Sequence, residues 1–188
     1  MCIRDRSKAQ NLSAINDNSI DIVLCHWALT LMDPITPVLD EIKRVLNTKG
    51  QFAALVDGPM NTAPGYKEVH DLIYSYVQEE IPSYGDIDLG DPRIRGSRSL
   101  NDLANKIFPE ADVTIETNVV SLEGPVIQVA EIAAGFFYAT FILKPEKRKS
   151  MIASLSNILE ISNEGADAER QGRFSMPISR LLVTPKKG

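Results

Sequence analysis

The sequence has 188 residues, of which 44% are hydrophobic and 24% are charged, and its formal net charge is −5. This length and composition suit one globular domain with a sizeable core. The acidic balance, without a basic block, argues against a dedicated nucleic-acid-binding surface. The longest apolar stretch, residues 126–143, is interrupted by Gln128 and Glu131 and is too short and too polar for a transmembrane segment. No secretory signal opens the sequence, and two cysteines indicate no disulfide framework, so we expect a cytoplasmic protein.

The first six residues, Met-Cys-Ile-Arg-Asp-Arg, are an unusual opening for a fold. They can be reverse-translated as ATG TGT ATA AGA GAC AG plus one base, which resembles the transposase end sequence of common sequencing adaptors. We therefore expect residues 1–6 to be translated adaptor sequence and residues 7–188 to be a single partial domain whose upstream portion is missing.

The first regular elements form a strand–helix–strand pattern. Residues 20–25 are a short, β-branched, apolar run that predicts a buried parallel strand. Asp33 suits the N-cap of a following helix and Pro34 its first position. Gly50 suits a left-handed cap that ends this unit, and residues 52–56 predict the next buried strand. This order predicts a right-handed parallel unit.

The remaining elements alternate between helices and strands. Helical spacing predicts a helix over residues 66–77, closed by Pro82, and Ser99 with Asp102 resembles a capping box for a second helix. Alternation predicts a strand over residues 113–119 and a final strand over residues 176–184. Between these strands we expect a helical segment over residues 126–161, interrupted at Pro145, and a polar loop over residues 162–172.

Several spaced motifs lie between Ala9 and Gly58, and they are Asn11-Leu12, Asn18-Ser19-Ile20-Asp21-Ile22-Val23-Leu24-Cys25, Asp33-Pro34, Glu41-Ile42-Lys43-Arg44-Val45-Leu46 and Gly50-Gln51-Phe52. Together they resemble the second half of the type 11 family of S-adenosylmethionine (SAM) dependent methyltransferases. The set is fairly specific, although no single motif is. The family's Lys-Pro-Gly-Gly turn reads Asn47-Thr48-Lys49-Gly50 here, which is a looser turn.

The resemblance implies an α/β fold: the C-terminal part of a Rossmann-like methyltransferase sheet, with strands 4-5-7-6 of the family's order 3-2-1-4-5-7-6 retained. It also implies two helical insertions on the substrate side, at residues 60–107 and 123–172. Without the preceding strands, the strand at residues 20–25 has an exposed edge, which invites aggregation or dimerisation. The oligomeric state of the whole protein stays open.

The cofactor implied by the resemblance is SAM. The resemblance places the adenine and methionine portions of SAM beside Ala9, Gln10, Asn11, Cys25, His26, Trp27 and Leu29. Packing of Trp27 and Leu29 under the helix is the alternative. Lys8 stands where the family often has an aspartate for the adenine amino group. The family's glycine-rich loop and its ribose-binding acid are absent, so we expect SAM binding to be poor or lacking.

Catalytic residues are not evident, because methyl transfer mainly requires positioning and a dry site. His26 is a weak candidate for a general base, with contact to cofactor or water as the alternative. Asp57 is a weak candidate for binding an acceptor amine, with a simple Asp57-Gly58 turn as the alternative. A lone carboxylate does not indicate a metal, so no metal site is predicted.

Three further groups have a structural and a functional interpretation. His70 lies on a helix face and is expected to be structural. Arg93, Arg95 and Arg98 could attract an acidic substrate or lie in a solvated loop. The aromatic group Phe136, Phe137, Tyr138 and Phe141 could line a pocket for an apolar substrate or pack between helices.

The function predicted is methyl transfer from SAM to a small-molecule or lipid-like acceptor, by a parent enzyme of which this chain is a fragment. A catalytically inactive methyltransferase-like scaffold or partner subunit is the first alternative. Half of a nucleotide-binding oxidoreductase is the second, and the helix ending in Glu-Ile-x-Arg-Val-Leu argues against it. We expect a small-molecule partner rather than nucleic acid.

Overall fold

The computed structural model describes residues 7–86, 90–161 and 170–186. The proposed adaptor sequence at residues 1–6, and most of the polar loop predicted at residues 162–172, lie outside the described residues. By compactness the chain divides into two units. The first, here called the sheet unit, holds residues 7–59, 90–118 and 178–186 of the described chain, and the second, the helical unit, holds residues 60–86, 119–161 and 170–177.

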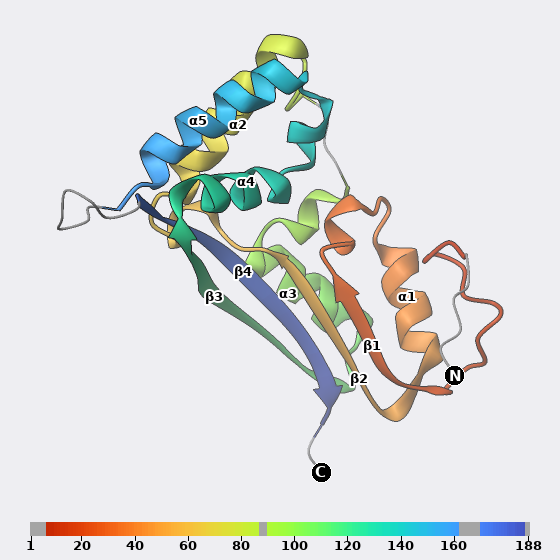
Figure 1. The fold of residues 1–188 in the computed structure, drawn as a ribbon. Helices are drawn as coiled ribbons and strands as arrows, with labels where there is room; N and C mark the ends of the chain where they lie inside the picture. Colours follow the sequence, from red (N-terminus) through yellow and green to blue (C-terminus); the bar gives the residue numbers. More distant parts are fainter. Residues whose placement is uncertain (1–6, 87–89, 162–169, 187–188) are drawn as a thin grey trace. The chain divides into compact units, whose positions relative to one another are not determined.

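Four strands form one mixed sheet in the order β1-β2-β4-β3 (Figure 1). They are β1 (Ile20–His26), β2 (Leu46–Asp57), β3 (Ala111–Pro125) and β4 (Gln171–Pro185). β1 runs parallel to β2, with Cys25 beside Ala54, and β2 runs antiparallel to β4, with Ala54 beside Leu181. All four predicted strands are therefore confirmed, each longer than predicted.

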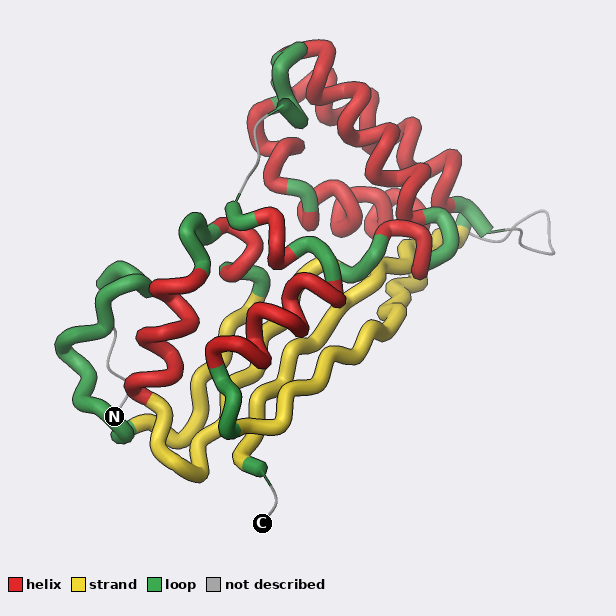
Figure 2. Tube along the Cα trace, turned by 180° about the vertical axis from the view of Figure 1, so that it is seen from behind, coloured by secondary structure: helices red, strands yellow, loops and turns green. Residues whose placement is uncertain are grey.

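One face of the sheet is covered by α1 (Thr36–Val45) and α3 (Ser97–Ile107), which lie on the same side of it (Figure 2). Strand alternation turns Phe52 and Ala54 of β2 toward these helices, and both are almost fully buried. The helices contribute their apolar stripes, including Leu39 and Leu100, to the same core. α1 connects β1 to the parallel strand β2, so the predicted strand–helix–strand unit lies at the centre of this packing.

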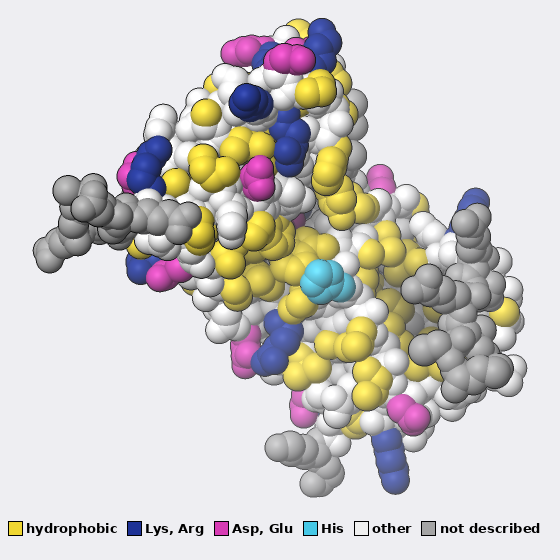
Figure 3. Space-filling model, in the orientation of Figure 1, with side chains coloured by type: hydrophobic (Ala, Val, Ile, Leu, Met, Phe, Trp, Pro, Cys, Tyr) yellow, Lys and Arg dark blue, Asp and Glu magenta, His cyan; other side chains and the backbone are white. Residues whose placement is uncertain are grey.

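The opposite face of β1 is open to solvent. Ile22 is 63% exposed and Leu24 is 76% exposed, although both belong to the strand predicted to be buried. That prediction is wrong for these two side chains, because α1 and α3 both cover the other face. Hydrophobic side chains gather over the strands on the face seen in Figure 3.

The helical unit contains α2 (Tyr66–Glu80), α4 (Val126–Phe136) and α5 (Pro145–Leu159). α2 ends before Pro82, as predicted, and packs against α5, where the Tyr76 hydroxyl lies 2.9 Å from the Ser154 hydroxyl. The helical segment predicted over residues 126–161 breaks earlier than expected, at Phe137. Pro145 does not interrupt it but begins α5, since the first turn of a helix needs no N–H from that residue.

The start of α1 differs from the prediction. The helix begins at Thr36, so neither Asp33 nor Pro34 has its predicted role, and Pro37 occupies the first turn instead. An acceptor comes from a distant segment: an Asp91 carboxylate oxygen lies 3.5 Å from the Ile35 N–H group. Asp91 also forms an ion pair with Arg93, at 2.6 Å, and this holds the pKa of Asp91 at about 2.

Two other predicted local signals are corrected. Gly50 does not cap α1 but lies inside β2, where a Cβ atom would come within 2.9 Å of the Ile20 carbonyl oxygen. The glycine therefore allows β1 and β2 to approach closely. Ser99 does not cap α3: Gly96 is at the N-cap, and the Ser99 hydroxyl donates to the Arg93 and Gly96 carbonyls.

Candidate functional site

The carboxyl ends of β1 and β2 lie side by side, with His26 beside Leu55 in the register. Immediately after His26 the backbone turns sharply, and Trp27 has a φ of 54°. The Trp27 N–H donates to the Leu55 carbonyl at 3.0 Å, and the Thr30 hydroxyl donates to the Trp27 carbonyl at 2.9 Å. These bonds hold the turn in a conformation that a bulky residue rarely adopts.

Two residues predicted for different roles meet at this edge. The indole Nε1–H of Trp27 donates to the Oδ1 atom of Asp57 at 2.8 Å. The His26 ring packs edge-on against the Trp27 ring, with centroids 4.7 Å apart. Trp27 was predicted beside the cofactor and Asp57 beside the acceptor, so their direct bond links the two predicted regions of the site.

A hollow of about 290 Å³ lies beside β1 within the sheet unit. Four of the seven predicted cofactor-binding residues line it: Ala9, Cys25, His26 and Leu29. Ala28, which follows the same strand end and was expected at the site with them, also lines it. The other residues that line it were not predicted from the sequence, and they are Leu12, Val23, Leu24, Met32, Val38 and Ile42. Strand alternation places Val23 with Cys25, and helical spacing places Val38 with Ile42, so these patterns could have predicted part of the lining.

Gln10, Asn11 and Trp27 do not line this hollow. Asn11 is occupied in its own loop, where its side-chain oxygen accepts from the Ser13 N–H at 3.1 Å. The roles predicted for Gln10 and Asn11 stay predictions.

Cys25 forms part of the wall of the hollow. Burial raises the pKa of its thiol above the ordinary value, while the N–H groups of Ala28 and Leu29 beside the sulfur act in the opposite direction. The thiol is therefore neutral near pH 7 and is a poor nucleophile. Its contribution to the hollow is packing.

The loop that carries Ala9 and Leu12 is anchored to α1 by Glu41 and Arg44. The Leu12 N–H donates to a Glu41 carboxylate oxygen at 2.6 Å, and Arg44 donates to the Leu12 and Ile15 carbonyls, both at 2.9 Å. The hydrogen bond from Arg44, followed by the one from the Leu12 N–H, lowers the pKa of Glu41 to about 2. The motif Glu41-Ile42-Lys43-Arg44 thus has a physical role: it fixes one wall of the hollow.

Replacing Arg44 by alanine is expected to release this loop. Two carbonyls lose a donor, and Glu41 loses the cation that neutralises it, so local opening becomes easier. Amide hydrogen exchange of residues 9–18 should accelerate about tenfold, which corresponds to about 1.4 kcal/mol of local stability. Lys43→Ala, on the same helix turn, is the control, and equal exchange rates in the two variants would contradict this anchoring role.

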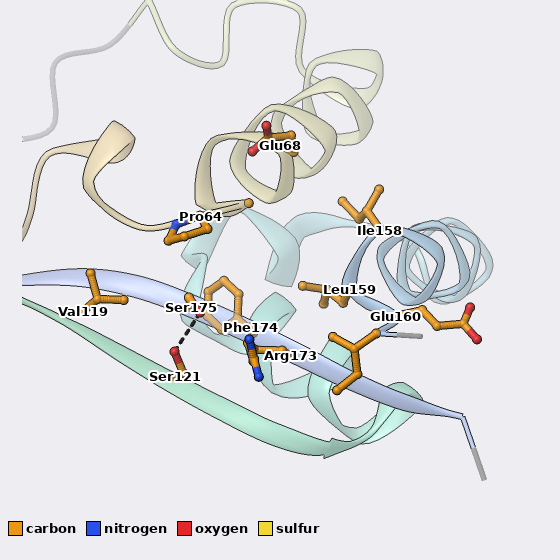
Figure 4. A pocket seen from close by; sticks show the side chains of 12 residues that line it. Pro64, Glu68, Val119, Ser121, Ile158, Leu159, Glu160, Arg173, Phe174 and Ser175 are labelled. Carbon is orange, nitrogen blue, oxygen red and sulfur yellow. Dashed lines mark hydrogen bonds between the residues drawn. The ribbon is translucent and has the colours of Figure 1, made fainter. Parts of the chain in front are cut away.

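A second hollow, of about 540 Å³, lies within the helical unit (Figure 4). Phe174 and Leu159 contribute apolar walls, and the Ser121 and Ser175 hydroxyls are hydrogen-bonded at 2.7 Å in its floor. None of the predicted aromatic group at Phe136, Phe137, Tyr138 and Phe141 lines it.

The predicted aromatic group is divided between packing and exposure. The Phe137 ring packs with Tyr66, and the Phe136 ring with Phe174, each at 6.0 Å between centroids. Tyr138 and Phe141 are 65% and 67% exposed. His70 stacks on Tyr74 at 4.0 Å, in line with its predicted structural role. Arg93 is engaged by Asp91, so it belongs to the fold of its loop rather than to a free basic group.

Within the described ranges, no three acidic, histidine or cysteine side chains are grouped closely enough to hold a metal ion. Among the same residues, no helix combines the length and apolar character needed to cross a bilayer.

Comparison with known families gives a match in the first part of the sheet unit. Residues 5–54 match a family described as a methyltransferase domain. The chain has the class I SAM-dependent methyltransferase fold, which confirms the resemblance drawn from the motifs between Ala9 and Gly58. A search of the curated proteins finds no match.

Solved structures of low sequence identity share this methyltransferase fold. The YcgJ protein of Bacillus subtilis is 12% identical with a TM-score of 0.53, and the match covers 98% of this chain and 71% of that protein. A candidate methyltransferase of Bacillus halodurans is 14% identical with a TM-score of 0.52, covering 96% and 71%. A candidate methyltransferase from an antibiotic biosynthesis pathway of Anabaena variabilis is 14% identical with a TM-score of 0.55, covering 96% and 72%.

The residues that line the hollow beside β1 do not match every part of SAM. Its apolar side chains, such as Val23 and Leu29, suit a flat adenine ring. SAM also carries ribose hydroxyls, an ammonium group and a sulfonium, and none of the residues lining the hollow is a carboxylate or a glycine. The side chains that line the hollow therefore do not fit SAM as a whole.

Proposed function

We propose that this chain is the acceptor-facing part of a SAM-dependent methyltransferase that acts on a small-molecule or lipid-like acceptor. The single observation that carries the proposal is the hollow at the end of β1, where Ala9, Cys25, His26 and Leu29 converge. Ligands of open α/β sheets bind beyond the carboxyl ends of parallel strands, which is where this hollow lies.

Two further observations support the assignment. The strand order β1-β2-β4-β3, with β4 antiparallel to β2, supports equating these strands with the fourth, fifth, seventh and sixth of the family's sheet. The match covers nearly all of this chain but 71–72% of the three similar structures, which supports a longer parent enzyme.

A catalytically inactive scaffold is the competing function. The lining of the hollow beside β1 favours the scaffold for the chain alone, because no carboxylate is there to hold the ribose or the ammonium of SAM. The complete open reading frame separates the two proposals: a glycine-rich loop and an acidic residue after the second strand would support catalysis by the parent, and their absence would support the scaffold.

The isolated chain is expected not to bind SAM measurably. Isothermal titration with SAM should give a dissociation constant weaker than about 1 mM, because apolar contacts to one ring must offset the cost of association. The parent enzyme, measured in the same buffer, is the positive control. Micromolar binding by this chain would contradict the proposal that the missing portion holds most of the cofactor.

A further inference from the structure

We propose that Trp27 is a positioning residue for Asp57, and that the Asp57 carboxylate receives the ammonium group of an amine acceptor. The inference rests on the proposed function, since it names the acceptor class of that same site. It also gives Trp27 a different role from the one predicted, because Trp27 does not line the hollow beside β1.

The backbone of Trp27 is held in an unfavourable conformation. Its φ of 54° lies in the left-handed region, and such strain persists only where the surroundings enforce it. Three hydrogen bonds enforce it, made by the Trp27 N–H to Leu55, by Thr30 to the Trp27 carbonyl, and by the indole N–H to Asp57. Strain of this kind is concentrated at functional sites, and this turn holds the Trp27 indole against the Asp57 carboxylate.

The turn presents a carboxylate with one oriented oxygen and one available oxygen. The indole N–H occupies Oδ1 of Asp57 at 2.8 Å and thereby restricts the rotation of the carboxylate. The side chain is solvent-exposed, and no Lys, Arg or His among the described residues forms an ion pair with it. A neutral donor fixes the group without cancelling its charge, so the complementary ligand is a cation.

The surroundings favour an ammonium group attached to an apolar body. Asp57 ends β2 beside the end of β1, at the ligand-binding edge of the parallel strands. The aromatic pair of His26 and Trp27 lies at the same edge, and His26 also lines the apolar hollow. Aromatic rings attract cations, and the hollow accommodates hydrocarbon, whereas an anionic acceptor would be repelled by Asp57.

The single tryptophan of the chain makes this proposal directly measurable, because all tryptophan fluorescence reports on Trp27. The chain is titrated with hexylammonium, and with hexanol and hexanoate as neutral and anionic probes of the same length. Hexylammonium is expected to change the emission saturably in the millimolar range, at least about fivefold more tightly than hexanol. Equal binding of hexylammonium and hexanol would overturn the proposal.

Two variants test the role of the carboxylate. Asp57→Asn keeps the shape of the side chain and removes its charge, so hexylammonium binding should weaken about fivefold. Asp112→Asn, at an exposed aspartate of β3 in the same unit, should leave it unchanged. Unaltered binding by Asp57→Asn would also overturn the proposal.

A double-mutant cycle tests the positioning role of Trp27, with binding followed by calorimetry because Trp27→Phe removes the fluorophore. Trp27→Phe keeps an aromatic ring but removes the N–H donor, and it should weaken hexylammonium binding about threefold. In the Asp57→Asn background the same change should have no further effect. Additive losses would show that Trp27 acts as a wall and would overturn its assigned role.

The test is separate from that of the proposed function, since it uses neither SAM nor methyl transfer. Failure of amine binding would leave the parent a methyltransferase for another acceptor class. Failure of the parent to bind SAM would leave the amine site standing on the same measurements.

Discussion

Replacing Gly90 by alanine is expected to destabilise the sheet unit by about 3 kcal/mol, from a left-handed backbone penalty and an overpacking penalty together. Gly90 has a φ of +71°, and a Cβ atom there would lie 2.2 Å from the Thr30 carbonyl oxygen. Backbone carbonyls cannot move aside as a flexible side chain can. Next to this contact, the Asp91 N–H donates to the Met32 carbonyl at 2.9 Å, and this hydrogen bond joins the same two segments.

Three other glycines separate the two penalties. Gly65 has a φ of +74° with no atom within 4 Å of the position that a Cβ atom would occupy, so Gly65→Ala should cost about 1 kcal/mol. Gly50 has the crowding without the positive φ, so Gly50→Ala should cost about 1–2 kcal/mol. Gly135 has neither and lies within α4, so Gly135→Ala should stabilise the protein by about 0.5–1 kcal/mol.

Urea unfolding measures these differences, with Trp27 fluorescence following the sheet unit and far-ultraviolet circular dichroism following the helices of both units. Gly50 and Gly90 belong to the sheet unit, whereas Gly65 and Gly135 belong to the helical unit. A Gly90→Ala variant within about 1 kcal/mol of the original chain would contradict the close approach of the segments around Gly90 and Thr30.

The regular elements were predictable because their signals are local. The apolar stripe of α1 reports burial of one face, and the structure confirms it. The alternation in residues 113–119 is confirmed as a strand, and Val113 and Ile115 pack against the core, but Thr117 and Val119 are exposed. The same reasoning failed for Ile22 and Leu24, since an apolar run cannot show which face has a covering layer. Burial on two faces is a tertiary property.

The caps were not predictable for a related reason. Asp33 and Ser99 are both suitable cap residues, but the N–H of Ile35 is approached by Asp91, which lies 56 positions away in the chain. Ser99 uses its hydroxyl on the Arg93 and Gly96 carbonyls instead. In the folded chain, acceptors from distant segments compete with local side chains for the free N–H groups of a helix start. A local sequence signal cannot show which acceptor makes the bond.

The candidate site was predictable in location but not in internal arrangement. Strand ends placed His26, Trp27 and Asp57 at one edge, as the parallel order requires. The bond between Trp27 and Asp57 depends on a positive φ that no sequence pattern indicates for tryptophan. By contrast, Glu41 and Arg44 were recognisable in the sequence only as part of a family motif, and their bonds to the loop at residues 12–17 explain that motif physically.

The open edge of β1 produces the largest expected effect on solution behaviour. In the described sheet β1 pairs with β2 alone, so its other edge keeps unpaired N–H and C=O groups. The Trp27 N–H points to β2, and alternation therefore turns the N–H groups of Leu24 and His26 outward. An edge of this kind beside exposed Ile22 and Leu24 favours pairing with a second copy, and we expect the isolated chain to dimerise or aggregate.

Lysine at both positions should prevent this association. In a two-fold pair each substitution occurs twice, so Ile22→Lys with Leu24→Lys removes four apolar side chains from the contact and introduces four like charges. The expected loss is at least about 3 kcal/mol, or about a hundredfold in the dimer dissociation constant. Sedimentation velocity over a range of concentrations measures this change.

Ile158→Lys is the matched control, because Ile158 is 47% exposed but belongs to α5 of the helical unit. Ile158→Lys should leave the association unchanged if the edge of β1 forms the contact between the two copies. A monodisperse monomer with a cooperative melt, in the chain without substitutions, would contradict the prediction. If Ile158→Lys abolished the association and Ile22→Lys with Leu24→Lys did not, the contact would lie in the helical unit.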